Sequence, residues 1–246
     1  MVPVSFAFDF AGEELRLVPG RHGAGRGATA LFWPREQALL VADLHLEKAS
    51  HYAKRGQFLP PYDSRETLDR LAAAVKETGA RRVYTLGDNF HDAGGPARLE
   101  AHATGMLAAL TGALDWVWII GNHDAGQDEV GRQSCGGTFV DELEVAGLIL
   151  RHRAKNGESR PELSGHYHPK IRVNLRQRHI ARPCGVIGKG RGGADRMILP
   201  AFGALTGGMD AADPAILGAL QPARRIDAIL PAAGRLVRLP LWREAA

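Results

Sequence analysis

Three apolar runs that each lead directly into polar, metal-capable side chains constrain this chain more than any other feature of its sequence. The three stretches are ALLVADLH at 38–45, VYTLGD at 83–88 and WVWIIGNHD at 116–124. Short apolar runs of this kind are typical of strands that are buried on both faces. Because the carboxyl ends of such strands form the ligand crevice of an open α/β sheet, we expect the three polar groups to meet in one place.

The elements predicted around these runs indicate a mixed α/β fold. Alternation of apolar and polar residues predicts half-buried strands near 4–8, 14–18 and 28–33. A helix is expected over 64–78, with a capping box at Asp63 and Gly79 at its end, and a second helix over 96–110. Alternating strands and helices predict a largely parallel inner sheet, followed after about residue 139 by short strands and tight turns.

The composition of the chain indicates where the protein acts more than it indicates the reaction. No stretch approaches the roughly 20 apolar residues of a membrane span, and two cysteines are too few for a disulfide framework. The acidic residues near the N-terminus do not fit a signal peptide. We therefore expect a soluble, cytoplasmic protein that needs no membrane. No composition shift marks a boundary, so residues 1–246 are expected to form a single domain.

Positive charge is concentrated in one segment of the chain. The net charge is only +4, but residues 151–196 carry twelve Lys and Arg against three acids. Such a segment is either a solvated basic face or a surface for a polyanion, and the sequence leaves both interpretations open. The basic residues that follow the last histidine pair within it are Lys170, Arg172, Arg176, Arg178 and Arg182.

Further histidines complete a set of candidate metal ligands. His152 follows the apolar run at 148–150, and His166 and His168 lie in GHYH at 165–168. Residues i and i+2 at the end of a strand point to the same side, and neighbouring glycines allow sharp turns there. Imidazole, carboxylate and amide ligands without thiolates suit Mn, Fe or Zn. The candidates are too many for one first-row ion and suit two ions that share a carboxylate, the arrangement used for phosphoryl-ester hydrolysis.

In this order, the motifs DxH, GD, GNHD, H and GHxH make the chain resemble the calcineurin-like metallophosphoesterases. Longer strings, including DLHLEKASH at 43–51, GHYHPK at 165–170 and LPAFGALTGG at 199–208, are similar to the bacterial ligase-associated DNA damage response endonuclease branch. The resemblance covers nearly the whole chain. It implies a four-layer αββα sandwich of two mixed sheets flanked by helices. It also implies two divalent ions per chain, with manganese favoured and iron, zinc and magnesium as alternatives.

The resemblance also implies a role for each matching position. Asp43, His45 and His168 would hold the first ion, Asn122, His152 and His166 the second, and Asp88 would bridge them. His123 would act on the substrate, and Asp124 would orient His123. Many relatives place Asp or Glu where His91-Asp92 stands here, so His91 could contact substrate or support the fold. His51 is the other histidine most expected to lie near the site.

These roles predict hydrolysis of a phosphodiester by a hydroxide that bridges two metal ions, with His123 as general acid. The branch and the basic segment favour DNA as the partner, with Lys170, Arg172 and Arg182 as contacts. The resemblance adds a role in DNA repair, ligase or helicase partners and a possible homo-oligomer. Two alternatives stay open: the same chemistry on cyclic nucleotides, nucleotides or phosphoproteins, and a scaffold that has kept the fold without activity.

Overall fold

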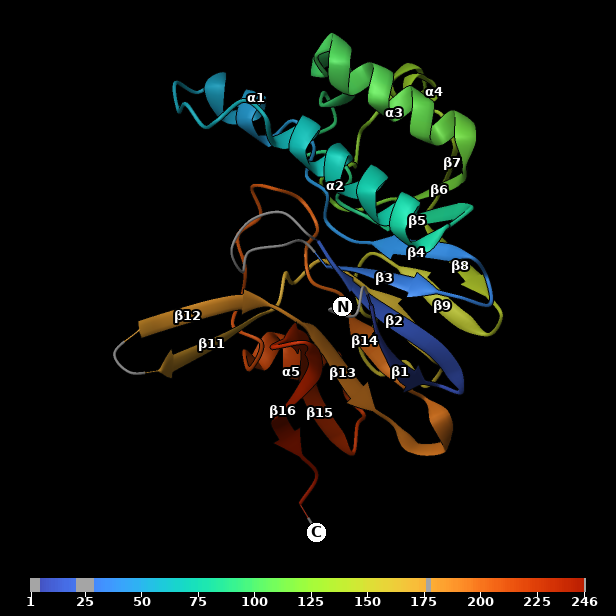
Figure 1. Cartoon of the computed structure of the whole chain (residues 1–246), viewed down its shortest axis with the longest axis vertical. Helices are drawn as coiled ribbons and strands as arrows, with labels where there is room; N and C mark the ends of the chain where they lie inside the picture. Colours follow the sequence, from blue (N-terminus) through green and yellow to red (C-terminus); the bar gives the residue numbers. More distant parts are fainter. Residues whose placement is uncertain (1–4, 21–28, 176–177, 246) are drawn as a thin grey trace.

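The computed structural model describes residues 5–20, 29–175 and 178–245 and contains two large mixed sheets that pack face to face (Figure 1). In the first sheet, β1–β4 are antiparallel and β4–β7 are parallel. Its strands, in spatial order, are β1 (Phe6–Phe10), β2 (Glu13–Pro19), β3 (Thr29–Trp33), β4 (Ala38–Val41), β5 (Arg82–Leu86), β6 (Asp115–Ile119) and β7 (Thr138–Val140). The parallel half therefore contains the three apolar runs, as predicted.

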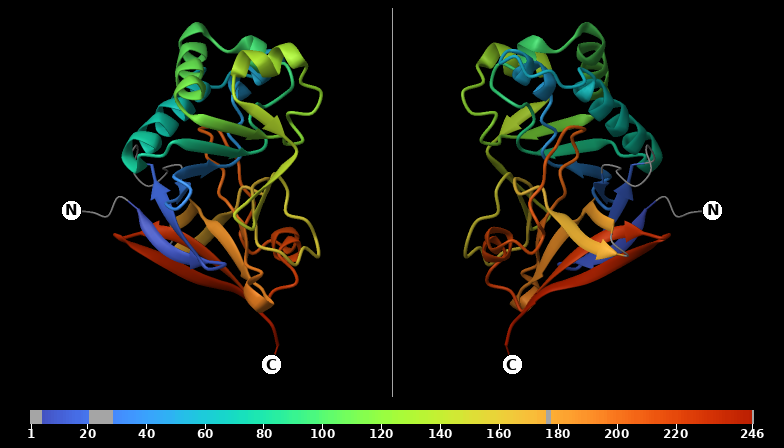
Figure 2. Two further views of the ribbon diagram at one scale, coloured as in Figure 1. Left: turned by 90° about the vertical axis from the view of Figure 1, so that its right-hand side faces the viewer. Right: turned by 90° about the vertical axis from the view of Figure 1, so that its left-hand side faces the viewer.

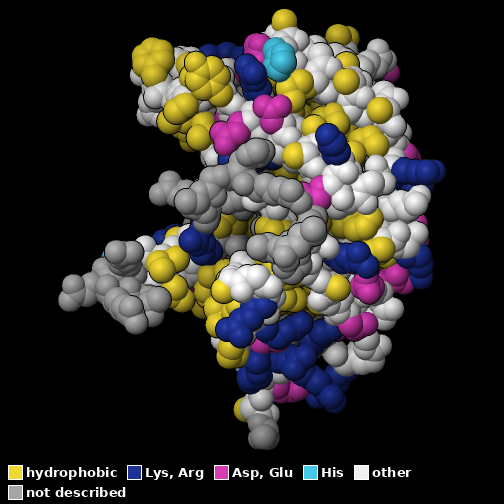
Figure 3. Space-filling model, viewed as in Figure 1, with side chains coloured by type: hydrophobic (Ala, Val, Ile, Leu, Met, Phe, Trp, Pro, Cys, Tyr) yellow, Lys and Arg dark blue, Asp and Glu magenta, His cyan; other side chains and the backbone are white. Residues whose placement is uncertain are grey.

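The second sheet is built from the later part of the chain and is mainly antiparallel. Among its described strands, β10 runs parallel to both of its neighbours, β9 and β14, and the other pairs are antiparallel. Its strands, in spatial order, are β16 (Arg235–Arg243), β15 (Arg225–Ala232), β13 (Gly185–Lys189), β14 (Arg196–Ile198), β10 (Glu162–Ser164), β9 (Leu148–Arg151) and β8 (Glu142–Val145). A separate ribbon of β11 (Lys170–Leu175) and β12 (Arg178–Pro183) projects from the body, and the surface between it and α1 is indented (Figure 3).

Helices cover the outer faces of both sheets, which gives four layers (Figure 2). The helices on the side of the first sheet are α1 (Lys48–Ala53), α2 (Asp63–Thr78), α3 (Ala101–Ala113) and α4 (Glu129–Cys135), and α5 (Pro214–Ala219) lies against the second sheet. Short 3-10 turns occur at η1 (Pro96–Arg98) and η2 (Arg191–Gly193). The predicted αββα arrangement is confirmed. No helix within the described ranges is both long and apolar enough to cross a membrane.

Three apolar clusters correspond to the three interfaces between these layers. The central cluster joins side chains of both sheets, among them Leu31 and Leu40 from the first and Leu150 and Leu163 from the second. A second cluster lies between the first sheet and α2 and α3, and a third lies between the second sheet and α5. Burial of apolar surface on both faces of β4 and β5 explains their unbroken apolar sequences.

The start of α2 differs from the predicted capping box. The helix begins at Asp63, and the residue before it makes no capping hydrogen bond with its side chain. Instead, the Asp63 carboxylate accepts a hydrogen bond from the backbone N–H of Ala49 at 3.1 Å. The Ser64 hydroxyl accepts one from the backbone N–H of Glu47 at 2.8 Å. These side chains therefore fasten α1 to α2. Gly79 ends the helix in the left-handed region, with φ 68°, as predicted.

The segment after β14 joins the two sheets beside the first apolar run. The backbone N–H of Phe202 donates to the carbonyl of Ala42 at 2.8 Å, and Ala42 pairs with Ala201 as an isolated parallel bridge. The two backbones are so close at the next residue that a Cβ on Gly203 would lie 2.1 Å from the carbonyl oxygen of Leu44. This contact fixes the second sheet against the DLH segment.

Replacing Gly203 with Ala should therefore lower the free energy of unfolding by about 2 kcal/mol or more, since neither backbone can yield without disturbing its sheet. Gly207→Ala is the matched control in the same segment, because a Cβ there meets nothing within 4 Å. Scanning calorimetry of both variants measures the difference. Equal melting temperatures would show that the contact does not constrain the fold.

Candidate metal centre

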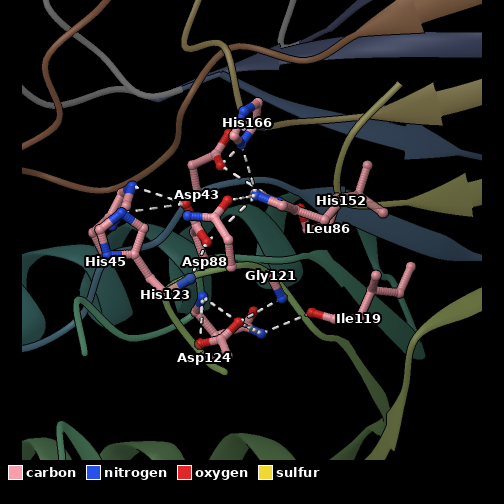
Figure 4. Close-up of polar contacts among 12 residues, drawn as sticks. Asp43, His45, Leu86, Asp88, Ile119, Gly121, His123, Asp124, His152 and His166 are labelled. Atoms are coloured by element: carbon pink, nitrogen blue, oxygen red, sulfur yellow. Dashed lines mark hydrogen bonds and ion pairs between the residues drawn. The ribbon is translucent and has the colours of Figure 1, made fainter. Parts of the chain in front are cut away.

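The polar groups that follow β4, β5 and β6 lie together with histidines from the second sheet (Figure 4). Asp43 and His45 follow β4, Asp88 follows β5, and Asn122 and His123 follow β6. The second sheet contributes His152 after β9, and His166 and His168 after β10. All seven predicted metal ligands therefore come from the edge where the two sheets meet.

The first group consists of Asp43, His45, Asp88 and His168, whose ligand atoms lie within 4.8 Å of one another. The Nε2 atoms of His45 and His168 are 3.2 Å apart. His168 Nε2 lies 3.4 Å from Asp43 Oδ1, and His45 Nε2 lies 3.7 Å from Asp88 Oδ2. Two imidazoles and two carboxylates thus converge on one point.

The second group consists of Asp88, His152 and His166, with Asn122 beside it. His152 Nε2 lies 3.0 Å from His166 Nδ1, 3.0 Å from Asn122 Oδ1 and 3.4 Å from Asp88 Oδ1. The other ring nitrogen, Nδ1, is 3.0 Å from the carbonyl oxygen of Leu86, to which it can donate. That bond leaves the Nε2 lone pair directed into the group, as in metal-binding histidines.

The donor chemistry of both groups fits divalent cations. The side chains of Asp43 and Asp88 are only 0% and 4% exposed, and within the described part of the chain neither carboxylate pairs with Lys or Arg. Buried carboxylates without a positive partner are strongly unfavourable, and a bound cation removes this penalty. Burial, followed by the nearby His168 and His123, lowers the pKa of His45 to about 2, and burial also lowers the pKa of His166. Both imidazoles are therefore held in the neutral form that binds metal.

The ligands converge through a left-handed backbone rather than through simple strand alternation. Five of the seven predicted ligands have positive φ: Asp43 at 54°, His45 at 45°, Asp88 at 49°, His166 at 76° and His168 at 49°. Asp and His tolerate this region better than most residues, but each instance still costs roughly 1–3 kcal/mol. Strain of this kind is typical of sites where the surrounding structure imposes the geometry.

The neighbouring glycines serve two purposes, only one of which was predicted. Gly87 has positive φ, 77°, and provides the expected turn. Gly121 and Gly165 instead leave room for ligands: a Cβ would lie 2.1 Å from the backbone nitrogen of Asp88 at Gly121, and 2.7 Å from Asp43 Oδ2 at Gly165. Close packing, not backbone freedom, therefore requires glycine at these two positions.

His123 lies at the solvent side of the first group. Its side chain is 37% exposed, and its Nε2 is 3.9 Å from Asp88 Oδ2. The Nδ1 atom lies 2.8 Å from the backbone carbonyl oxygen of His91, to which it can donate, and the two rings stack with centroids 5.1 Å apart. Burial is the main cause that lowers the pKa of His91 to about 4. His123 is thus oriented with Nε2 accessible to a ligand.

Asp124 does not have the predicted role of orienting His123. Its carboxylate accepts from the backbone N–H groups of Asn89, Phe90 and Gly121 at 2.9–3.1 Å, and from the Asn89 side-chain amide at 2.9 Å. The side chain is directed inward because the backbone turns after Asn122, so it joins the loops that follow β5 and β6. The carbonyl of His91 takes the orienting role instead.

Comparison with solved structures agrees with this donor chemistry. No family model matches the sequence, and none of the curated proteins does. The structure is similar to that of Pseudomonas putida nuclease MPE, with a TM-score of 0.70, 28% sequence identity and coverage of 96% of this chain and 100% of the nuclease. With this likeness, the chain fits a metallophosphoesterase, a hydrolase that acts on phosphoric ester bonds, and its clustered His and Asp side chains suit divalent metal. The structure of YfcE, a phosphoesterase from E. coli, is more distant, with a TM-score of 0.42, 13% sequence identity and coverage of 83% of this chain and 98% of YfcE.

The structure adds neighbours of the metal centre that the motifs do not include. His51 forms a short hydrogen bond with Asp92, which pairs with Arg98 at 2.8 Å, and the His51 ring lies edge-on to His91 at 4.8 Å. Lys48 is half-buried, and burial lowers its pKa. Its sequence position beside the DLH motif is the only signal that could have identified it.

Among the basic residues of the segment 151–196, some lie in the second sheet and others lie on the ribbon of β11 and β12. Arg151 and Arg196 are buried and pair with Glu162 at 3.2 and 2.8 Å, and Lys189 pairs with Asp195, so these cations stabilise the second sheet. The predicted contacts Lys170, Arg172 and Arg182 lie on the ribbon. Arg176 falls outside the described residues, and the Arg178 side chain is not described.

The two faces of the ribbon separate the remaining basic residues. Lys170 and Arg172 share one face and contact the carbonyls of Thr206 and Gly208 at 3.2 and 3.3 Å. Arg182 lies directly across from Ile171 in the register of the two strands, and residues that face each other across strands share a face. Because Ile171 alternates with Lys170 and Arg172, Arg182 lies on the opposite face of the ribbon from these two residues. The expected basic track therefore cannot run along a single face of the ribbon.

Replacing Asp124 with Asn should lower the free energy of unfolding by about 2 kcal/mol. The side-chain NH2 group of asparagine cannot accept hydrogen bonds, so some of the backbone N–H groups that now donate to the carboxylate would lose their acceptor. Asp128→Asn is the matched control, since Asp128 caps α4 through the N–H of Gly131 and asparagine caps a helix equally well. Urea denaturation measures both variants. A loss of the same size in the control would refute the assigned role.

Proposed function

We propose that this metallophosphoesterase is a DNA phosphodiesterase of the endonuclease type, which uses two divalent ions bridged by Asp88. The observation that carries the proposal is the position of the Asp88 carboxylate, since Oδ2 faces the first ligand group and Oδ1 faces the second. Manganese is the favoured ion, with iron, zinc and magnesium as alternatives for the same donor set. The similar Pseudomonas putida protein is a nuclease, which supports nucleic acid as the substrate class.

Each group of residues would have a distinct task. Asp43, His45, Asp88 and His168 would hold one ion, and Asp88, Asn122, His152 and His166 the other. When bound, the pair supplies positive charge to the phosphoryl oxygens and a water acidic enough to attack phosphorus near neutral pH.

His123 would act on the substrate without holding a metal. Since Nδ1 donates to the carbonyl of His91, Nε2 is the atom that faces the ester. A protonated Nε2 can donate to a phosphoryl or leaving-group oxygen, which is general-acid catalysis. The resemblance to the ligase-associated endonuclease branch supports a role in DNA repair.

Asp88→Asn should abolish binding of the ion pair and nearly all hydrolysis, because an amide offers only one oxygen to the two ligand groups. Titration of the metal-free variant with manganese, followed by calorimetry, gives the number of ions bound. Two ions per chain at the affinity of the unaltered protein would contradict the bridging role.

His123→Ala should retain both ions and lose about a hundredfold or more in kcat, the range expected when a positioned acid is removed. His102→Ala, at an exposed histidine of α3, is the control for the substitution itself and should keep full activity. If the folded His123→Ala protein loses an ion, His123 is a ligand and not a substrate contact.

Arg172→Ala should weaken DNA binding and lower the slope of its salt dependence by about one, the effect of one lost phosphate contact. Arg182→Ala, on the opposite face of the ribbon, should have a smaller effect. The assay uses the manganese-loaded enzyme and compares plasmid, single-stranded DNA and a chromogenic phosphodiester as its substrates. Activity on the small ester alone, or equal responses of DNA and ester to Arg172→Ala, would favour a small-molecule substrate.

A further inference from the structure

Large apolar side chains protrude from the segment between α1 and α2. Phe58 is 86% exposed, Tyr62 65% and Leu59 38%. In Figure 3 hydrophobic side chains gather at the upper left corner of the molecule, around α1, on one side of the indentation. Single exposed apolar residues are common, but two aromatic rings in five residues form a patch of the kind that marks a binding surface.

We propose that Phe58 and Tyr62 form a stacking platform for unpaired nucleobases of the strand that the metal centre cleaves. The proposal rests on the proposed function and extends it from the phosphate to the bases. Aromatic side chains on which successive bases stack, beside a positive surface, are the usual means of binding single strands without reading their sequence.

The platform is held in place at both ends. At one end, the backbone N–H groups of Arg55 and Gln57 donate to the carbonyl of Tyr52 at 2.9 and 3.1 Å. At the other end, Asp63 and Ser64 bond to the backbone just before and at the start of α1. Pro60 and Pro61 further restrict the backbone between the aromatic rings. Rings presented on a fixed backbone lose little conformational entropy on binding.

Helix α1, which leads into the platform, contacts residues beside the metal centre. Tyr52, in the last turn of α1, stacks on His91 with ring centroids 5.6 Å apart, and His91 stacks on His123. Arg98 donates from Nε to the hydroxyl of Ser50 at 2.9 Å, which fixes α1 from its other side. The proposed path of the strand therefore follows α1 from His123 to Phe58.

The charge around the platform favours a polyanion. Lys54 and Arg55 are exposed beside it, and no Asp or Glu occurs between Lys48 and Tyr62. Asp63, which follows Tyr62, is buried and bonds to the backbone of α1, and the exposed Glu66 lies on α2, so the exposed charge on the α1 side of the platform is positive and complements phosphates beside the bases.

The test uses the full-length, manganese-loaded enzyme and competition against hydrolysis of a chromogenic phosphodiester. The competitors are a short oligothymidine and an abasic strand of the same length, which has the same phosphates but no bases. The Phe58→Ala/Tyr62→Ala variant should raise the inhibition constant of oligothymidine by about tenfold or more, the loss expected for one or two stacked bases. The inhibition constant of the abasic strand should stay within experimental error. Phe58→Trp, which keeps an aromatic face, should retain the affinity for oligothymidine.

Val130→Ala is the matched control, because Val130 is 74% exposed on α4 and should leave both constants unchanged. If Phe58→Ala/Tyr62→Ala weakens inhibition by the two strands equally, or by neither, the stacking platform is refuted. Cleavage of DNA by the unaltered enzyme would in that case still support the proposed function. If the unaltered enzyme hydrolyses the small ester but neither cleaves DNA nor is inhibited by oligothymidine, both proposals fail.

Discussion

The buried carboxylate of Asp88 is the constraint on which the rest of this structure depends. It lies between two groups of imidazoles at the junction of the two sheets, and no lysine or arginine of the described residues neutralises it. A carboxylate in such a position is unfavourable unless cations bind beside it. Gly121 leaves room for the backbone and carboxylate of Asp88, and Gly165 and Gly203 leave room in the same way for the neighbouring Asp43–Leu44 segment.

The site stores strain that the fold has to balance. Left-handed backbone at Asp43, His45, Asp88, His166 and His168 would relax in an isolated loop. Here the turns are held by the Asp124 carboxylate and by the N–H of His166, which donates to Asp43 at 2.9 Å. The apolar cluster between the sheets then prevents the two sets of turns from separating. Fold stability and ligand geometry are therefore linked.

Local patterns in the sequence were sufficient to predict the mixed α/β fold and the ligand cluster, whereas the four layers were implied by the resemblance to a known family. Apolar runs that end in polar residues identify strand ends, and strand ends of a parallel sheet meet. What the sequence could not show depends on contacts between distant segments. Asp63 and Asp124 have partners other than those expected, and Arg151 and Arg196 are buried in ion pairs with Glu162. The face on which Arg182 lies required the register of the ribbon.

The most direct test of this account is the electron paramagnetic resonance spectrum of the manganese-loaded protein. Two Mn²⁺ ions that share the Asp88 carboxylate are close enough for their spins to couple. The account predicts the closely spaced hyperfine lines of an exchange-coupled pair, which should be lost in Asp88→Asn. A spectrum of isolated Mn²⁺ at full metal loading would show that the ligand groups act independently, and would contradict the central role given to Asp88.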